Sequence, residues 1–217
     1  SDVTDLILLK EIAKIKKPVI LSTGMSNKSE IFAAINSLKN KKIILLHCVS
    51  LYPCSLQQIN LKRMRTLSKI FRKKVGFSDH TIGVEASIMA INNGAKYIEK
   101  HFTLDKNMIG PDHILSADER DLRTICNFAK NFNKINGNGN INPSYKELKI
   151  KKIANKSVYL KNEKKKGEVV KFNDLEIRRP AGFFSPKDIN KIVGKLSKKN
   201  LHKGTNLKNL HLSKKIN

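Results

Sequence analysis

Residues 75–101 read VGFSDHTIGVEASIMAINNGAKYIEKH, and this stretch decides the fold. A short apolar run ends in the polar residues 78–80, and helical spacing of apolar residues follows over 82–92. An Asn-Gly stop signal then separates the helix from a second apolar run at 97–101. Two short apolar strands joined by a helix predict a parallel βαβ unit.

The same cycle of helix and strand occurs upstream. Helices are expected at 6–15, 30–38 and 61–71, and strands at 19–21 and 43–47. Strands that are apolar throughout are buried on both faces, so the pattern predicts an α/β fold, either a (β/α) barrel or a doubly wound sheet. Polar residues follow each strand. Because ligands gather at the carboxyl ends of parallel strands, we expect one shared site there.

The chain of 217 residues is long enough for two small domains. Residues 1–135 carry the repeated strands and end in a helix expected at 118–132. Residues 136–148 contain an Asn- and Gly-rich run and are expected to form a linker. Residues 149–217 predict a small, mostly β module with a helix at 186–193.

Composition limits the classes of function. The net charge is +25, but the lysines are scattered beside Asn and Ile, which disfavours a dedicated nucleic-acid surface and still allows attraction of small anionic substrates. Three cysteines without CxxC spacing argue against disulfides and a structural zinc site, and favour the cytoplasm. Neither a signal-peptide pattern nor an apolar run near the ~20 residues of a membrane helix is present.

Five motifs at the ends of the expected strands carry a family likeness. They are KPVILSTGM (17–25), LHCVSLYP (46–53), GFSDHT (76–81), IEKHFTLD (98–105) and GPDH (110–113). In this order they resemble the sialic acid synthase family, which includes N-acetylneuraminate and legionaminate synthases. The C-terminal region resembles the antifreeze-like, or SAF, domain of those enzymes.

The resemblance implies a TIM (β/α)8 barrel of which this chain holds strands five to eight, followed by the SAF domain. We therefore expect an N-terminally truncated chain whose missing half would supply a catalytic glutamate and phosphoenolpyruvate-binding lysines. The implied reaction condenses phosphoenolpyruvate with an N-acetylated hexosamine, such as N-acetylmannosamine or a legionaminate precursor. The implied products are phosphate and a nine-carbon 2-keto sugar acid, and the resemblance also implies a domain-swapped homodimer.

His80 and His101 follow successive strands and are the expected metal ligands and catalytic residues. Imidazole suits ions such as Mn²⁺, and two protein ligands leave positions open for water and a sugar aldehyde. The resemblance favours Mn²⁺, with Mg²⁺ and Co²⁺ as alternatives. The competing interpretation is a pair of structural histidines in a strand.

Hydroxyl groups at the strand ends are expected to donate hydrogen bonds to phosphate or carboxylate groups of the substrate. The alternative for these serines, Ser22, Ser50 and Ser78, is helix capping. The resemblance adds Tyr52 and Asp112 as sugar contacts, although Asp112 also suits a turn. Asp2 matches the end of the family's S-x-D/E motif and is a further expected substrate contact.

Arg179 is expected, by resemblance, to reach the N-acetyl group of a sugar bound in the other subunit. A solvated arginine is the alternative, and Ala181-Gly182-Phe183 departs from the family's Gly-x-Gly. His47, Glu99 and Lys100 are expected to be structural or supporting, and Cys48 to be a small core residue.

Two functions from other classes compete with the synthase. A non-catalytic sugar-binding or interaction fragment is one, since half of a barrel would lack the catalytic base. A nucleic-acid binder is the other, and no nucleic-acid motif supports it.

Overall fold

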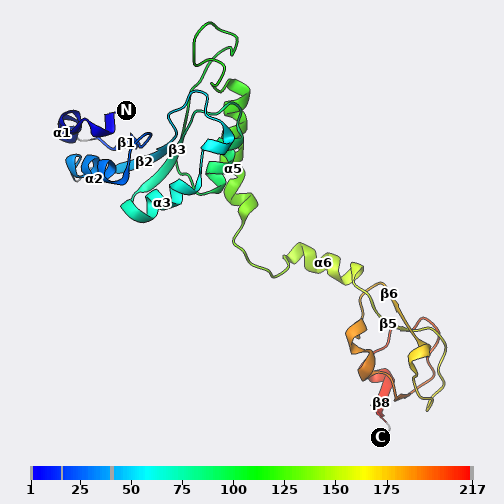
Figure 1. Cartoon of the computed structure of the whole chain (residues 1–217). Helices are drawn as coiled ribbons and strands as arrows, with labels where there is room; N and C mark the ends of the chain where they lie inside the picture. Colours follow the sequence, from blue (N-terminus) through cyan, green and yellow to red (C-terminus); the bar gives the residue numbers. More distant parts are fainter. Residues whose placement is uncertain (1, 16, 40–41, 216–217) are drawn as a thin grey trace. The chain divides into compact units, whose positions relative to one another are not determined.

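The computed structural model describes residues 2–15, 17–39 and 42–215 of the chain. Contacts divide the chain into two compact units, Ser1–Gly139 and Asn140–Asn217 (Figure 1). The first unit contains a parallel sheet covered by helices, and the second contains two small antiparallel sheets. No helix in the described part of the chain has the length and apolar character needed to cross a membrane.

A curled, four-stranded parallel sheet forms the centre of the first unit. Its strands are β1 (Val19–Ser22), β2 (Ile43–Cys48), β3 (Lys74–Asp79) and β4 (Ile98–Lys100), and they pair in sequence order. The register aligns Cys48 with Ser78, and Asp79 with Lys100, so the carboxyl ends of β2, β3 and β4 lie together. The four predicted strands are present, they are parallel, and they pair in sequence order, which confirms the predicted α/β half-barrel. Which half of a barrel they represent stays a prediction.

The helices of the first unit begin and end at local signals. They are α1 (Leu6–Lys14), α2 (Lys28–Ser37), α3 (Lys62–Phe71), α4 (Glu85–Asn92) and α5 (Glu119–Asn136), with short 3₁₀ turns at Asp2–Thr4 and Leu56–Gln58. Asn27 and Asp118 accept hydrogen bonds from the first turns of α2 and α5, as capping residues do. Helix α4 begins later than predicted, because Gly83 has a φ of +86° that an α-helix does not allow.

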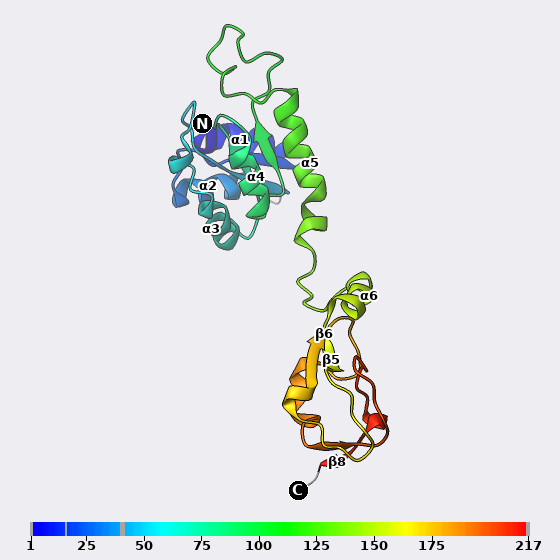
Figure 2. The same cartoon turned by 90° about the vertical axis from the view of Figure 1, so that its right-hand side faces the viewer.

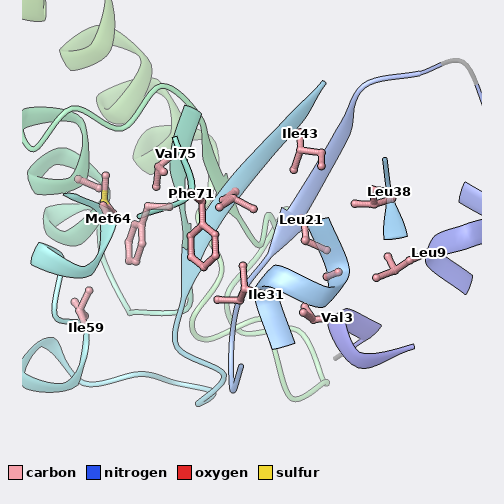
Figure 3. Close-up of a cluster of buried hydrophobic side chains, with 14 of the residues drawn as sticks. Val3, Leu9, Leu21, Ile31, Leu38, Ile43, Ile59, Met64, Phe71 and Val75 are labelled. Carbon is pink, nitrogen blue, oxygen red and sulfur yellow. The ribbon is translucent and has the colours of Figure 1, made fainter. Parts of the chain in front are cut away.

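A continuous core lies between the sheet and its helices (Figure 3). Leu21, Ile43 and Val75 from the strands pack against Ile31 of α2 and Phe71 of α3. Helices α2, α3 and α4 thus cover one face of the sheet (Figure 2). Side chains alternate along a strand, so the residues between these core positions point to the opposite face.

The second unit begins with a helix where a linker and strands were expected. Helix α6 (Tyr145–Ala154) occupies positions assigned to the linker and to the start of the β module, where Ser144 and Glu147 form a capping box. The strands are β5 (Ser157–Leu160), β6 (Leu175–Arg178), β7 (Lys195–Ser197) and β8 (Leu212–Lys215). The expected helix at 186–193 is a 3₁₀ helix, Pro186–Lys191, and two further 3₁₀ turns lie at Phe172–Asp174 and Asn209–His211.

Candidate active site

His80 follows β3 and is held in a fixed orientation. Its Nδ1 lies 2.8 Å from the backbone carbonyl oxygen of Val49, which requires that Nδ1 carry the proton. In the neutral ring the Nε2 atom then keeps its lone pair, and it lies 3.4 Å from the hydroxyl oxygen of Ser78. Burial acts to lower the pKa of His80, but the neighbouring Cys48 and the Val49 carbonyl outweigh it and raise that pKa above its ordinary value.

His101 follows β4 and lies beside His80, with ring centroids 5.6 Å apart and the rings nearly perpendicular. Its Nδ1 lies 3.5 Å from a carboxylate oxygen of Asp112. The loop that carries Asp112 is tied down: the Ser116 hydroxyl donates to the Asp112 carbonyl oxygen at 2.7 Å. Each imidazole thus faces an oxygen through Nδ1.

Tyr52 covers the histidine pair. Its ring lies 4.0 Å from the His80 ring and 5.7 Å from the His101 ring, measured between centroids. About half of the tyrosine side chain stays exposed, so the residue forms an accessible wall of the site. Burial raises the pKa of Tyr52 above its ordinary value, and nearby Cys48, Asp112 and Glu99 add to the effect.

Ser78 and Glu99 join the site from neighbouring strands. They are register partners, and the Ser78 hydroxyl donates a 2.7 Å hydrogen bond to a Glu99 carboxylate oxygen. Glu99 was expected to be a structural or supporting residue, and its place beside Ser78 was not predicted. The signal was available: Glu99 precedes His101 by two positions, so both point to the same face of β4.

Cys48 and Ser50 form the β2 side of the site. The Cys48 sulfur lies 3.9 Å from both the Ser50 hydroxyl and Nδ1 of His80. Burial acts to raise the pKa of the Cys48 thiol, but the hydrogen bond and the charge of His80, together with the Ser50 and Ser78 hydroxyls, outweigh it and lower that pKa. A side chain at Gly24 would collide with the Ser50 hydroxyl and come within 3.0 Å of the Cys48 sulfur, so it would displace these two side chains of the site.

Three further predicted residues belong to other segments of the chain. Ser22 ends β1 and is in register with Leu46, while Asp2 lies exposed in the 3₁₀ turn before α1. Arg179 belongs to the second unit, where its Nε donates a 2.6 Å hydrogen bond to the Ala154 carbonyl oxygen. The structure therefore brings together the two histidines with Ser50, Tyr52, Ser78 and Asp112.

The donor set of the two histidines fits a divalent metal ion. Metal-binding imidazoles commonly use one nitrogen for the ion and donate the other N–H to a carbonyl or carboxylate oxygen. Val49 and Asp112 are partners of these two kinds for His80 and His101. No group of three or more His, Cys, Asp or Glu side chains is arranged for metal binding within residues 2–15, 17–39 and 42–215.

A curled parallel sheet with polar side chains gathered at the carboxyl ends of its strands places the chain in the class of α/β-barrel proteins. A family model confirms and narrows this class: the NeuB family model matches residues 1–141. The chain therefore belongs to the NeuB family.

Similar proteins agree with this assignment. The chain is 42% identical over 205 residues to the N,N'-diacetyllegionaminic acid synthase of Campylobacter jejuni, covering 92% of this chain and 61% of the relative. It is 37% identical to the Legionella pneumophila synthase of the same name, with 95% and 60% covered. The chain thus spans about three fifths of the length of these curated relatives.

A solved structure gives the same result for the fold. The N-acetylneuraminic acid synthetase of Leptospira borgpetersenii aligns with a TM-score of 0.62 and 35% identity, covering 69% of this chain and 53% of that protein. The structure of that enzyme was determined in complex with citrate.

Proposed function

We propose that this chain carries the metal and sugar sites of a sialic acid-type synthase. The reaction condenses phosphoenolpyruvate with an N-acetylated hexosamine to give a nine-carbon 2-keto sugar acid and phosphate. Support comes from the synthase names of the relatives and from one observation in the structure. That observation is the adjacent pair of imidazoles, each with an oxygen partner at Nδ1 and the pair covered by one tyrosine ring.

His80 and His101 would hold the metal ion through the nitrogens that face away from Val49 and Asp112. Mn²⁺ is the proposed ion, with Mg²⁺ and Co²⁺ as alternatives. When bound, it supplies a positive charge that polarises the aldehyde carbonyl of the sugar. Asp112 accepts hydrogen bonds from sugar hydroxyls, and the exposed face of Tyr52 packs on the sugar ring.

Ser22 and Ser50 would bind the anionic groups of the substrates, and Ser78 would bind a donor group of a substrate instead. Ser50 and Ser22 have hydroxyl donors for a carboxylate or phosphate. Ser78 already donates to Glu99, so its oxygen accepts a further hydrogen bond rather than donating one. The net charge of +25 attracts phosphoenolpyruvate to the protein as a whole.

Further contacts in the proposal come from residues outside the cluster. Asp2 would contribute a substrate contact. Arg179 would contact the N-acetyl group in a homodimer whose SAF-like second unit is exchanged between subunits. The proposed setting is the cytoplasm, which suits three free thiols.

An assay for 2-keto sugar acid tests the proposed function. Phosphoenolpyruvate, Mn²⁺ and N-acetylmannosamine or the legionaminate precursor are incubated with the chain, with and without the N-terminal segment of the Campylobacter jejuni relative. Product detected by mass spectrometry on complementation supports the synthase. Folded protein that gives no product in either mixture favours the competing function, a non-catalytic sugar-binding fragment.

A second measurement tests the metal site alone. Mn²⁺ binding is followed by electron paramagnetic resonance for the chain and for His80→Ala, His101→Ala and His202→Ala. The first two variants are expected to lose binding at least tenfold, while His202, exposed in the second unit, serves as the matched control. Equal binding by all four proteins would remove the metal assignment.

A further inference from the structure

A buried ion pair lies directly behind the two histidines. The Lys100 Nζ and a carboxylate oxygen of Asp79 are 3.2 Å apart, and the two side chains are 4% and 0% exposed. Asp79 immediately precedes His80, and Lys100 immediately precedes His101. The two residues are also register partners across β3 and β4, so one contact joins both strands at the point where the site begins.

Every hydrogen-bonding group of the pair has a partner. One Asp79 oxygen accepts from the backbone N–H of Thr81 at 2.9 Å and from the Thr81 hydroxyl at 2.8 Å. The other oxygen accepts from the Ser87 hydroxyl at 2.6 Å, which ties in helix α4. Lys100 donates to the Thr81 carbonyl oxygen at 2.6 Å. The network fixes the backbone on both sides of His80.

Stability alone does not explain this arrangement. Removing two charges from water costs nearly as much as their attraction returns, so apolar residues of the same size often stabilise a protein equally well. The geometry gives the pair a second effect. Because side chains alternate along a strand, Asp79 and Lys100 point toward the helices. Their sequence neighbours point to the open face, which is the face of the sheet that α2, α3 and α4 do not cover. These neighbours are Ser78, His80, Glu99 and His101.

We propose that Asp79 and Lys100 are positioning residues that set the separation and orientation of the two imidazoles. They do so without contacting substrate or metal: the ion pair locks the register of β3 against β4, and Thr81 and Ser87 lock the turn after His80. This inference rests on the proposed function for its metal readout, and its structural readout does not depend on that function.

The test uses a double variant of the chain, Asp79→Asn with Lys100→Met. Each single charge removal leaves the other charge buried and is expected to unfold the first unit in part. The double variant keeps an amide oxygen for Thr81 and leaves no unpaired charge, so it is expected to fold. The matched control is Asp174→Asn with Lys164→Met, which removes a mostly buried ion pair of 2.7 Å in the second unit.

Two readouts are compared for the double variant, the control and the unaltered chain. The ¹⁵N signals of the imidazole rings report the surroundings of His80 and His101, and electron paramagnetic resonance reports the affinity for Mn²⁺. The double variant is expected to shift both ring signals and to bind Mn²⁺ about tenfold more weakly. This is the low end of the ~10- to 100-fold loss that follows removal of a direct partner of a metal ligand, because the ion pair acts on the imidazoles only through the backbone. The control is expected to change neither.

The outcomes separate the two ideas. A folded double variant with the ring signals and Mn²⁺ affinity of the unaltered chain overturns the positioning role and leaves a purely structural ion pair. If the unaltered chain binds no Mn²⁺, the proposed metal site fails. The ring signals then decide the positioning role by themselves: shifted signals support it, and unshifted signals overturn it.

Discussion

Gly76 should not tolerate even a methyl group, although its backbone conformation is ordinary for a strand. It lies in the middle of β3, in register with Leu46 of β2. A Cβ atom at this position would overlap the Tyr97 carbonyl oxygen and would lie 2.7 Å from Leu46 Cδ2 and 2.8 Å from Tyr97 Cβ. Ordinary contact starts near 3.4 Å, so Gly76→Ala forces β4 away from β3.

The magnitude follows from this geometry. Overpacking of a core costs about 1–3 kcal/mol, and loss of a backbone hydrogen bond adds about 1 kcal/mol. The bonds at risk flank the clash: the Phe77 N–H donates to the Tyr97 carbonyl oxygen at 2.9 Å, and the Lys96 N–H to the Val75 carbonyl oxygen at 3.2 Å. Gly76→Ala is therefore expected to lower the free energy of unfolding by about 2–4 kcal/mol, a large part of the ~5–15 kcal/mol typical of a domain.

Urea unfolding followed by circular dichroism measures this loss, and amide hydrogen exchange at Phe77 and Lys96 locates it. Gly94→Ala is the matched control, because Gly94 has open space around its Cα and a φ of +93°. That control is expected to cost about 1–2 kcal/mol from backbone strain alone and to leave exchange at Phe77 unchanged. A Gly76→Ala variant as stable as the unaltered chain, or with unchanged exchange at both amides, would refute the reasoning.

Three further predictions concern stability. Burial lowers the pKa of His47 below its ordinary value. The charge of Arg63 also lowers this pKa, and the hydrogen bond to the Ile59 carbonyl only partly offsets them, so the unfolded state binds more protons than the folded state. The contribution of His47 to the free energy of unfolding should therefore fall as the pH drops below about 6.5. In urea titrations at several pH values, the stability difference between His47→Gln and the unaltered chain should shift in favour of the variant as the pH falls, and a constant difference contradicts this. Asn27→Ala removes the cap of α2 and should cost about 1 kcal/mol by the same assay; no loss would argue against the capping box. Leu160→Ala should cost about 2–5 kcal/mol in the second unit and leave amide exchange in the first unit unchanged, while faster exchange in both would contradict two separate units.

The strands and most helices were predictable because their signals are local. Short apolar runs predicted β2 and β3. Helix α5 was predicted at 118–132 and ends four residues later, where Gly137 caps it. Helix α6 was missed although its Ser144 and Glu147 have capping-box spacing, since the Asn- and Gly-rich run before it indicated a linker. Local signals compete with composition, and here the capping signal was the better guide.

The site was predictable residue by residue, but its contacts were not. Motif order placed His80, His101 and Ser78 at neighbouring strand ends, and the structure has them there. The ring contact between Tyr52 and His80 depends on the path of the loop after β2, which no pattern in the sequence encodes. Glu99 was undervalued because its role depends on the register of β4 against β3.

Side chains alternate between the two faces along β3 and β4, so each of three consecutive residues can have its own role. This applies to Ser78-Asp79-His80 and to Glu99-Lys100-His101. The first and third residues of each triplet face the side of the sheet that the helices do not cover, where Ser78 contacts both Glu99 and His80. The middle residues, Asp79 and Lys100, face the helices and form a buried ion pair. Strand β4 has only three residues, and among the outer residues only the hydrogen bond from Ser78 to Glu99 links it to β3 through side chains. The charged pair adds a second side-chain link on the other face, so recognition of the site from sequence and its rigidity in the fold depend on the same six positions.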